Sequence, residues 1–361
     1  MFTASRNRVL RLLGLVLALV LVAAACGNDD NKSTAPAGPG ATEPAEQVTL
    51  NLGYFPNITH STAIVGVEKG IYAKALGTNV ELKTQTFNAG PEATEAIFAG
   101  AVDAQFIGPN PAINAFAKSD GKAIRIVSGS TSGGAYFIVK NSIGGANDLK
   151  GKKIATPQLG NTQDVALRSW LKEQGLTTDT TGGGDVSIIP QENADTLNAF
   201  KAGEIEGAWV PEPWATRLLQ EGGDAKVLVD ERDLWPDGKY VTTHLIVRTE
   251  YLNDHPDVIK KLLEGHIEAT KLVNENGAEA RTLANDGIEK VTGKRIADAV
   301  IVASWGNLTF TTDPIASSLA KSAKAAESVG LLDPVDLAGI YDLKLLNEVL
   351  AGAGESGVSG L

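Results

Sequence analysis

The sequence has little cysteine and little histidine, and this limits its metal chemistry. Cys26 is the only cysteine among 361 residues, so no disulfide can form within the chain and no cysteine cluster can hold zinc. The four histidines do not have the spacing of zinc ligands either; they are His60, His244, His255 and His266. We therefore expect no bound metal and no other cofactor.

Positive charge is also scarce, with 32 Lys and Arg against 43 Asp and Glu and a net charge of −11. Nucleic-acid binding needs clustered Lys and Arg to neutralise phosphates, so we expect no nucleic-acid partner. The glycine-rich loops of nucleotide-binding proteins are missing as well. An acidic chain can still bind one small anion, because a neutral cleft rich in hydrogen-bond donors is sufficient for that.

The N-terminal segment has no apolar run long enough to span a bilayer, which takes about 20 residues. Three arginines precede a run of 14 small and apolar residues, Leu12 to Ala25, and this pattern is typical of a secretory signal peptide. The three alanines before Cys26 resemble the bacterial lipobox, in which the cysteine becomes the first residue and is acylated. We expect a signal peptide at 1–25, then a lipidated Cys26 and a flexible, polar tether over 26–46. The chain would then lie outside the cytoplasm, anchored to the outer face of the cell membrane.

After residue 46, strand patterns of period two alternate with helical patterns of period 3.6. Such alternation predicts right-handed βαβ units, and hence an α/β protein with mostly parallel sheets. The length exceeds what one core usually serves, so we predict two lobes. Lobe 1 would be 47–137 plus 246–361, with an almost entirely helical C-terminal region, and lobe 2 would be 138–245. The predicted hinge strands lie near Phe137–Val139 and Thr243–Ile246.

Five predicted strand-to-helix loops contain hydroxyls, amides, glycines and one imidazole, but no lysine or arginine. They are residues 54–62, 108–112, 128–134, 157–164 and 210–214. In open α/β sheets, ligands bind beyond the carboxyl ends of strands, and the free N–H groups of a helix start carry partial positive charge. We therefore predict one small-anion site made by these loops. The candidate residues, including one from a nearby strand, are Asn57, His60, Ser61, Asn110, Ser130, Thr131, Gly133, Gly134, Asn161, Thr162, Gln163, Glu212, Trp214 and His244.

Each candidate also has a purely structural explanation. Asn110 and Asn161 can be ordinary helix caps, and residues 128–134 can be a mobile turn. Trp214 and His244 can be packing residues. A carboxylate at Glu212 would suit a cationic or donor-rich group on the ligand rather than a simple anion.

Several segments, in the correct order, resemble the aliphatic sulfonate, nitrate and taurine family of transporter-associated binding proteins. They are Leu52–His60, Val65–Tyr72, Gly100–Asp103, Gly108–Pro111, Asp148–Pro157, Gly160–Asp164 and Gly203–Trp214. The resemblance implies a type II periplasmic-binding fold that closes around its ligand. The residues that it places near the ligand are His60, Asn110, Ser130, Thr131, Gly133, Asn161, Thr162, Gln163, Glu212 and Trp214.

The resemblance also implies a function, which is binding rather than catalysis. The ligand would be a sulfonate-like small anion, an aliphatic sulfonate or taurine, with nitrate, bicarbonate or a pyrimidine thiamine precursor as alternatives. The partners would be an ABC permease and its cytoplasmic ATPase, with the binding protein itself a monomer. Two other classes remain open: an enzyme on the same fold, and a surface sensor or adhesin without a transporter.

Overall fold

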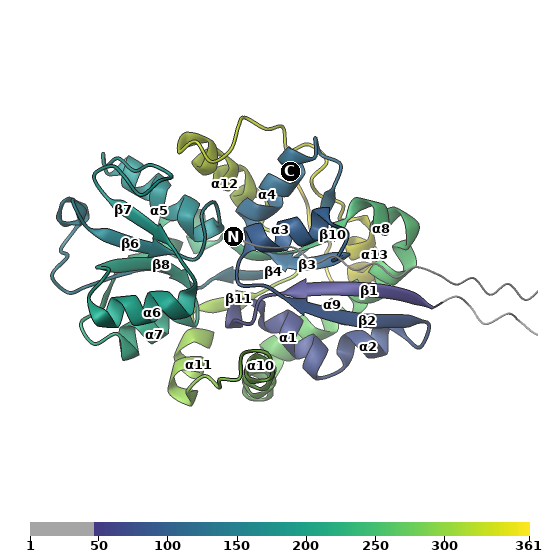
Figure 1. Ribbon diagram of the computed structural model, residues 1–361. Coiled ribbons are helices and arrows are strands. Elements are labelled where there is room, and N and C mark those ends of the chain that lie inside the picture. Colours follow the sequence, from purple (N-terminus) through teal and green to yellow (C-terminus); the bar gives the residue numbers. More distant parts are fainter. Residues whose placement is uncertain (1–46) are drawn as a thin grey trace, which may run out of the picture. The chain divides into compact units, whose positions relative to one another are not determined.

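The computed structural model describes residues 47–361, and within them the chain builds two β-sheets (Figure 1). The expected signal peptide, Cys26 and tether lie outside the described residues. Over residues 47–361, every helix is too short or too polar to cross a bilayer.

The first sheet, called sheet A here, has the strand order β11-β4-β10-β3-β1-β2. Strand β1 is parallel to both β2 and β3, whereas β10 is antiparallel to β3 and β4, and β11 is antiparallel to β4. The strands of sheet A are β1 (Val48–Tyr54), β2 (Val80–Thr86), β3 (Ala104–Ile107), β4 (Ile124–Gly133), β10 (Val241–Arg248) and β11 (Leu308–Phe310).

The second sheet, sheet B, has the order β7-β6-β8-β5-β9. Strand β6 is parallel to β7 and β8, and β5 is antiparallel to β8 and β9. The strands of sheet B are β5 (Ala135–Val139), β6 (Lys153–Thr156), β7 (Ser187–Pro190), β8 (Gly207–Pro211) and β9 (Lys226–Asp230).

The predicted α/β class is confirmed, but both sheets are mixed rather than mostly parallel. In each sheet one strand is inserted antiparallel between two strands that run the same way: β10 in sheet A and β5 in sheet B. These are the strands by which the chain enters each sheet from the other. Alternation of strands and helices predicts parallel neighbours only where a helix intervenes, so it could not reveal these two insertions.

Helices follow most strands and fill the C-terminal region, as the sequence predicts. Those before β10 are α1 (Ser61–Glu68), α2 (Ile71–Leu76), α3 (Gly90–Phe98), α4 (Pro109–Lys118), α5 (Thr162–Glu173), α6 (Asn193–Ala202) and α7 (Trp214–Glu221). Those after it are α8 (Thr249–Asp254), α9 (Pro256–Glu275), α10 (Gly277–Thr292), α11 (Asp298–Trp305), α12 (Ala316–Ser328) and α13 (Lys344–Gly352).

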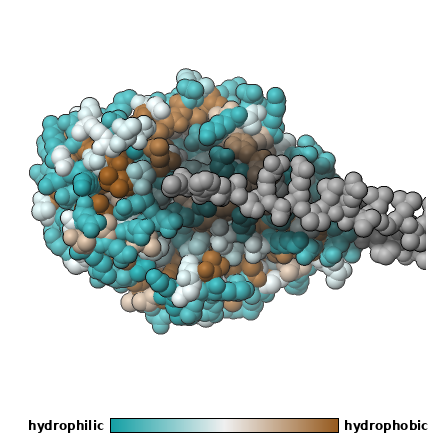
Figure 2. All heavy atoms as spheres, viewed as in Figure 1, coloured by the Kyte–Doolittle hydropathy of each residue, from teal (hydrophilic) through white to brown (hydrophobic). Residues whose placement is uncertain are grey.

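Each sheet buries both of its faces. In β5 the neighbouring residues Phe137 and Ile138 belong to two different apolar clusters, because successive side chains of a strand point to opposite faces. Leu52 and Ile107 lie in two further clusters in sheet A. The face seen in Figure 2 is mostly hydrophilic, with apolar residues in small groups. The sheets are therefore held by separate cores under a polar surface.

The chain passes from sheet A to sheet B at Gly134 and returns between Asp230 and Val241. The predicted hinge segments, Phe137–Val139 and Thr243–Ile246, lie inside β5 and β10, just after these passages. The lobe limits stay a prediction. Two C-terminal helices also reach sheet B: α11 packs on α7 and α12 on α5 (Figure 1).

Candidate functional site

A small cavity lies where the carboxyl ends of parallel strands from the two sheets meet. Its volume is about 30 Å3. The loops after β1, β2 and β3 form one side, the loops after β6, β7 and β8 form the other, and Thr242 of β10 completes it. Within residues 47–361, every side chain that lines this cavity is uncharged.

Several helices begin at the cavity. Gly90, Thr162 and Asn193 are the first residues of α3, α5 and α6, while His60 and Gly108 immediately precede α1 and α4, and all five residues line the cavity. The first N–H groups of a helix have no partner within the helix and carry partial positive charge. The cavity is therefore electropositive without containing a cationic side chain.

The amide side chains in the cavity have their oxygens already engaged. Asn57 Oδ1 accepts from the backbone N–H of Thr59 (3.1 Å) and from its hydroxyl (2.6 Å). Asn161 Oδ1 caps α5 by accepting from the N–H of Asp164 (2.8 Å), and Gln163 Oε1 accepts from Asn161 Nδ2 (3.1 Å). What remains for a ligand is N–H, on Asn57 Nδ2 and Gln163 Nε2.

His60 is a further neutral donor. Its ring is 2 % exposed, and its Nδ1 accepts the backbone N–H of Phe55 (3.2 Å). The neutral ring therefore carries its proton on Nε2. Burial lowers the pKa of His60 to about 3, so the ring stays uncharged at physiological pH.

Asn193 was missed by the sequence analysis. It is 5 % exposed, and its Oδ1 has no hydrogen-bond partner among the described residues. An unpartnered buried polar atom is costly in a folded protein. Asn88 and Gly90 were missed with it, although a proline following Gly90 is a typical helix-start signal that could have revealed that loop.

The structure brings only part of the predicted set together. The predicted residues that line the cavity are Asn57, His60, Asn161, Thr162 and Gln163. Segment 128–134, predicted as a turn, instead belongs mostly to β4, where it pairs with β10 and β11. Its glycines and hydroxyls, Ser130, Thr131, Gly133 and Gly134, therefore serve the strand and the passage between sheets.

Other predicted residues make bonds within the protein. Ser61 Oγ donates to the carbonyl of Ile58 (2.7 Å), and Asn110 Nδ2 donates to the carbonyl of Ser322 (3.1 Å). His244 Nε2 is bonded to the carbonyl of Pro314 (3.1 Å). None of these three predicted residues lines the cavity.

Glu212 does not face the cavity, contrary to the expectation of a carboxylate near the ligand. It is 1 % exposed, and its carboxylate accepts from the N–H (3.0 Å) and hydroxyl (2.8 Å) of Thr216 and from Asn307 Nδ2 (2.7 Å). Burial raises the pKa of Glu212, and these hydrogen bonds partly oppose that rise. Its acceptors are consumed by a structural role, joining the β8–α7 loop to the segment before β11.

Trp214 lies in a second, larger hollow, which we call the groove. The groove has a volume of about 870 Å3 and shares Asn57, Asn88 and Asn193 with the cavity. Its charged members are Glu92, Glu192, Arg217, Glu221, Lys294 and Arg295. The cavity therefore opens into a wider, partly apolar space.

The fold resembles solved binding proteins. The nitrate-binding protein NrtA from Synechocystis PCC 6803 superposes with a TM-score of 0.67 at 18% identity, covering 85% of this chain and 89% of that one. Among sequence relatives, a Brucella abortus protein named as a binding protein is 27% identical over 220 residues, 60% of this chain and 65% of that protein. The taurine-binding periplasmic protein of Escherichia coli is 26% identical over 216 residues, 60% of this chain and 63% of that protein.

The chain thus spans less than two thirds of the length of the curated relatives that it matches. Over a longer stretch, residues 43–285 match the family described as NMT1-like. That stretch includes every loop that lines the cavity. The chain therefore belongs to the NMT1-like family.

Proposed function

We propose that this chain is the extracytoplasmic solute-binding protein of an ABC importer and that it binds a small oxyanion, foremost a sulfonate, in the cavity. The observation that carries this proposal is the donor-only lining of the cavity. Amide oxygens at Asn57, Asn161 and Gln163 are occupied, and N–H groups are left free. A ligand that only accepts hydrogen bonds matches such a lining.

The free energy of binding would come from hydrogen bonds to a charged ligand. Such bonds contribute about 1.5–3 kcal/mol each. No carboxylate lines the cavity to repel an anion, and no cation forms a salt bridge with it. The affinity should therefore depend weakly on ionic strength for a charged ligand, because the binding groups are buried and neutral.

Nitrate or hydrogencarbonate is the second candidate, favoured by the volume of the cavity. One water needs about 10–15 Å3 by the same measure, so about 30 Å3 admits only a few heavy atoms. The pyrimidine alternative loses its support, because the carboxylate expected to meet an amino group, Glu212, is bonded elsewhere.

Transport would follow from closure of the two sheets around the ligand. The cavity takes its walls from both sheets, so a ligand that contacts both favours the closed arrangement over an open one. The closed form would dock on a permease driven by a cytoplasmic ATPase. Lipid attachment at Cys26 would keep the monomeric protein at the outer face of the membrane.

The proposal is tested by isothermal titration calorimetry with methanesulfonate, taurine, nitrate, hydrogencarbonate and an aminopyrimidine. We expect at least one oxyanion to bind and the aminopyrimidine not to bind. Mass spectrometry of the ligand after incubation should show it unchanged, since binding without turnover is proposed. Failure of every oxyanion to bind, or chemical conversion of a bound one, would contradict the proposal.

A further inference from the structure

The groove beside the cavity has no role in holding a lone oxyanion. It reaches the cavity through three asparagines, Asn57, Asn88 and Asn193, which line both. Its volume, about 870 Å3, is far larger than the roughly 30 Å3 of the cavity. A ligand anchored in the cavity can therefore extend into the groove without crossing a protein wall.

One wall of the groove carries an indole whose position is fixed. Trp214 begins α7, and the guanidinium of Arg217 lies 4.7 Å from its ring centroid. Arg217 is in turn held by two hydrogen bonds to Glu221, at 2.8 and 3.1 Å. Pre-ordered aromatic surface of this kind binds apolar groups at little cost in side-chain entropy.

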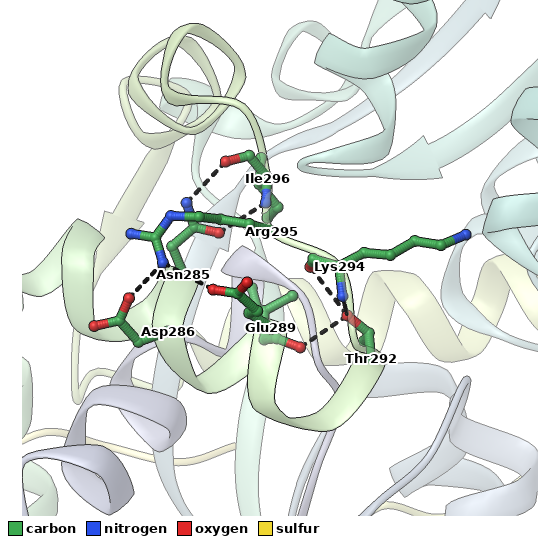
Figure 3. A network of polar contacts seen from close by, with 8 residues as sticks. Asn285, Asp286, Glu289, Thr292, Lys294, Arg295 and Ile296 are labelled. Carbon is green, nitrogen blue, oxygen red and sulfur yellow. Dashed lines mark hydrogen bonds and ion pairs between the residues drawn. The ribbon is translucent and has the colours of Figure 1, made fainter.

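The facing wall is the connection between α10 and α11, residues 293–297. Asn285 fixes it by two bonds to the backbone of Ile296, both 2.8 Å long. Arg295 pairs with Asp286 (2.5 Å) and Glu289 (3.1 Å), as Figure 3 shows. Ile296 and Ala297 of this held connection line the groove.

We infer that the ligand is an organosulfonate whose sulfonate occupies the cavity and whose apolar alkyl or aryl body lies in the groove between Trp214 and Ile296. This rests on the proposed function. It selects among the anions left open above, because nitrate, hydrogencarbonate and methanesulfonate would leave the groove unused. Lys294, which also lines the groove, extends away from the network of Figure 3 with no interaction drawn. The apolar walls, rather than an ammonium-binding carboxylate, set the class of the body.

The test compares dissociation constants of the full chain for methane-, butane-, hexane- and benzenesulfonate by calorimetry. Each fully buried methylene strengthens binding about fourfold, so we expect hexanesulfonate to bind at least about tenfold more tightly than methanesulfonate even with partial burial. Benzenesulfonate should show a similar gain.

Two variants locate the gain. Trp214→Ala removes the indole, and Ala297→Trp fills the groove without removing packing. Both should bring the ratio of the methanesulfonate and hexanesulfonate constants close to one. Phe98→Ala, which removes a 41 % exposed aromatic residue outside the groove, is the control and should keep the wild-type ratio.

Equal binding of short and long sulfonates by the wild type would overturn this inference while leaving the proposed function standing. Absence of binding by every sulfonate and every inorganic oxyanion would overturn both. A length preference that survives in both Trp214→Ala and Ala297→Trp would also overturn the inference, since the body would then lie elsewhere.

Discussion

The cavity and the two buried carboxylates near the passages between the sheets differ in how completely their hydrogen bonds are made. In the cavity, Asn57 and Gln163 leave N–H groups unused, and Asn193 Oδ1 has no partner among the described residues. Near the passages, Glu212 accepts three bonds, and Glu231 accepts one from Trp209 Nε1 at 2.8 Å. An incomplete set of bonds suits a guest, whereas a completed set serves the fold.

The largest expected effect concerns Glu231, at the start of the return passage, and it should appear in stability alone. Burial raises its pKa to about 7, with the Trp209 bond opposing the rise. Between pH 4.5 and 7 the folded protein keeps a proton that the unfolded chain loses. This contribution is therefore fully present below pH 4.5 and lost as the pH rises through 7. It amounts to about 3 kcal/mol of unfolding free energy.

Denaturant unfolding of the wild type and Glu231→Gln from pH 4.5 to 8 measures this difference. The buried histidines His60, His244 and His266 act in the opposite direction, because burial lowers their pKa values to about 3, 4 and 4. They are present in both proteins and cancel in the comparison. Parallel stability profiles for the two proteins would contradict the prediction.

Removing a donor from the cavity should affect ligand binding most directly. His60→Phe deletes the Nε2–H, so oxyanion affinity should fall by about 1.5–3 kcal/mol, roughly 10- to 100-fold. The wild-type affinity should be the same at pH 5.5 and pH 8, since the His60 pKa of about 3 keeps the ring neutral throughout. Calorimetry at both pH values checks this.

The matched control is His266→Phe. His266 is also fully buried, but its Nε2 is bonded to the carbonyl of Gly129 (2.8 Å) and it does not line the cavity. This variant should lose stability and keep its affinity. Similar losses of affinity in both histidine variants would remove His60 from the site.

Glu212→Gln separates the two regions from the other side. The amide can replace only part of the carboxylate's acceptor capacity toward Thr216 and Asn307, so unfolding free energy should fall by about 1–2 kcal/mol. Ligand affinity should stay within twofold of the wild type, as measured by calorimetry. A large change in ligand preference would restore the sequence-based expectation that this carboxylate faces the ligand.

The smallest effect should come from Asn193→Leu, and its two parts should have opposite signs. Removing an unpartnered buried oxygen should leave the ligand-free protein as stable as before or about 1 kcal/mol more stable, while oxyanion affinity falls. Thermal unfolding with and without ligand measures both. A loss of stability without ligand would show that Asn193 has a structural role.

Local signals in the sequence were enough for part of the site. Asn161 and Thr162 were found because a capping residue before a helix start is a local pattern, and His60 because it sits in a polar loop after a strand. The α/β class followed from periodicity alone. These features depend on residues within one helical turn of each other.

What the sequence could not reveal depends on distant partners. The hydroxyl-rich stretch 128–134 is a strand because β10 and β11 pair with it from more than 100 residues away. Glu212 is turned from the ligand by Asn307, 95 residues later. Asn193 follows a short strand that ends in Pro190, and only the meeting of two sheets gives it a role.

The connection at 293–297 has a consequence for how this binding protein could be re-targeted. The family match ends at Asn285, so the loops that hold the anion precede that point and the wall that would contact the rest of the ligand follows it. Exchange of residues 286–297 between relatives would then change the preferred side group while conserving recognition of the acid. Anion capture and side-group selection would be inherited as separable modules of one chain.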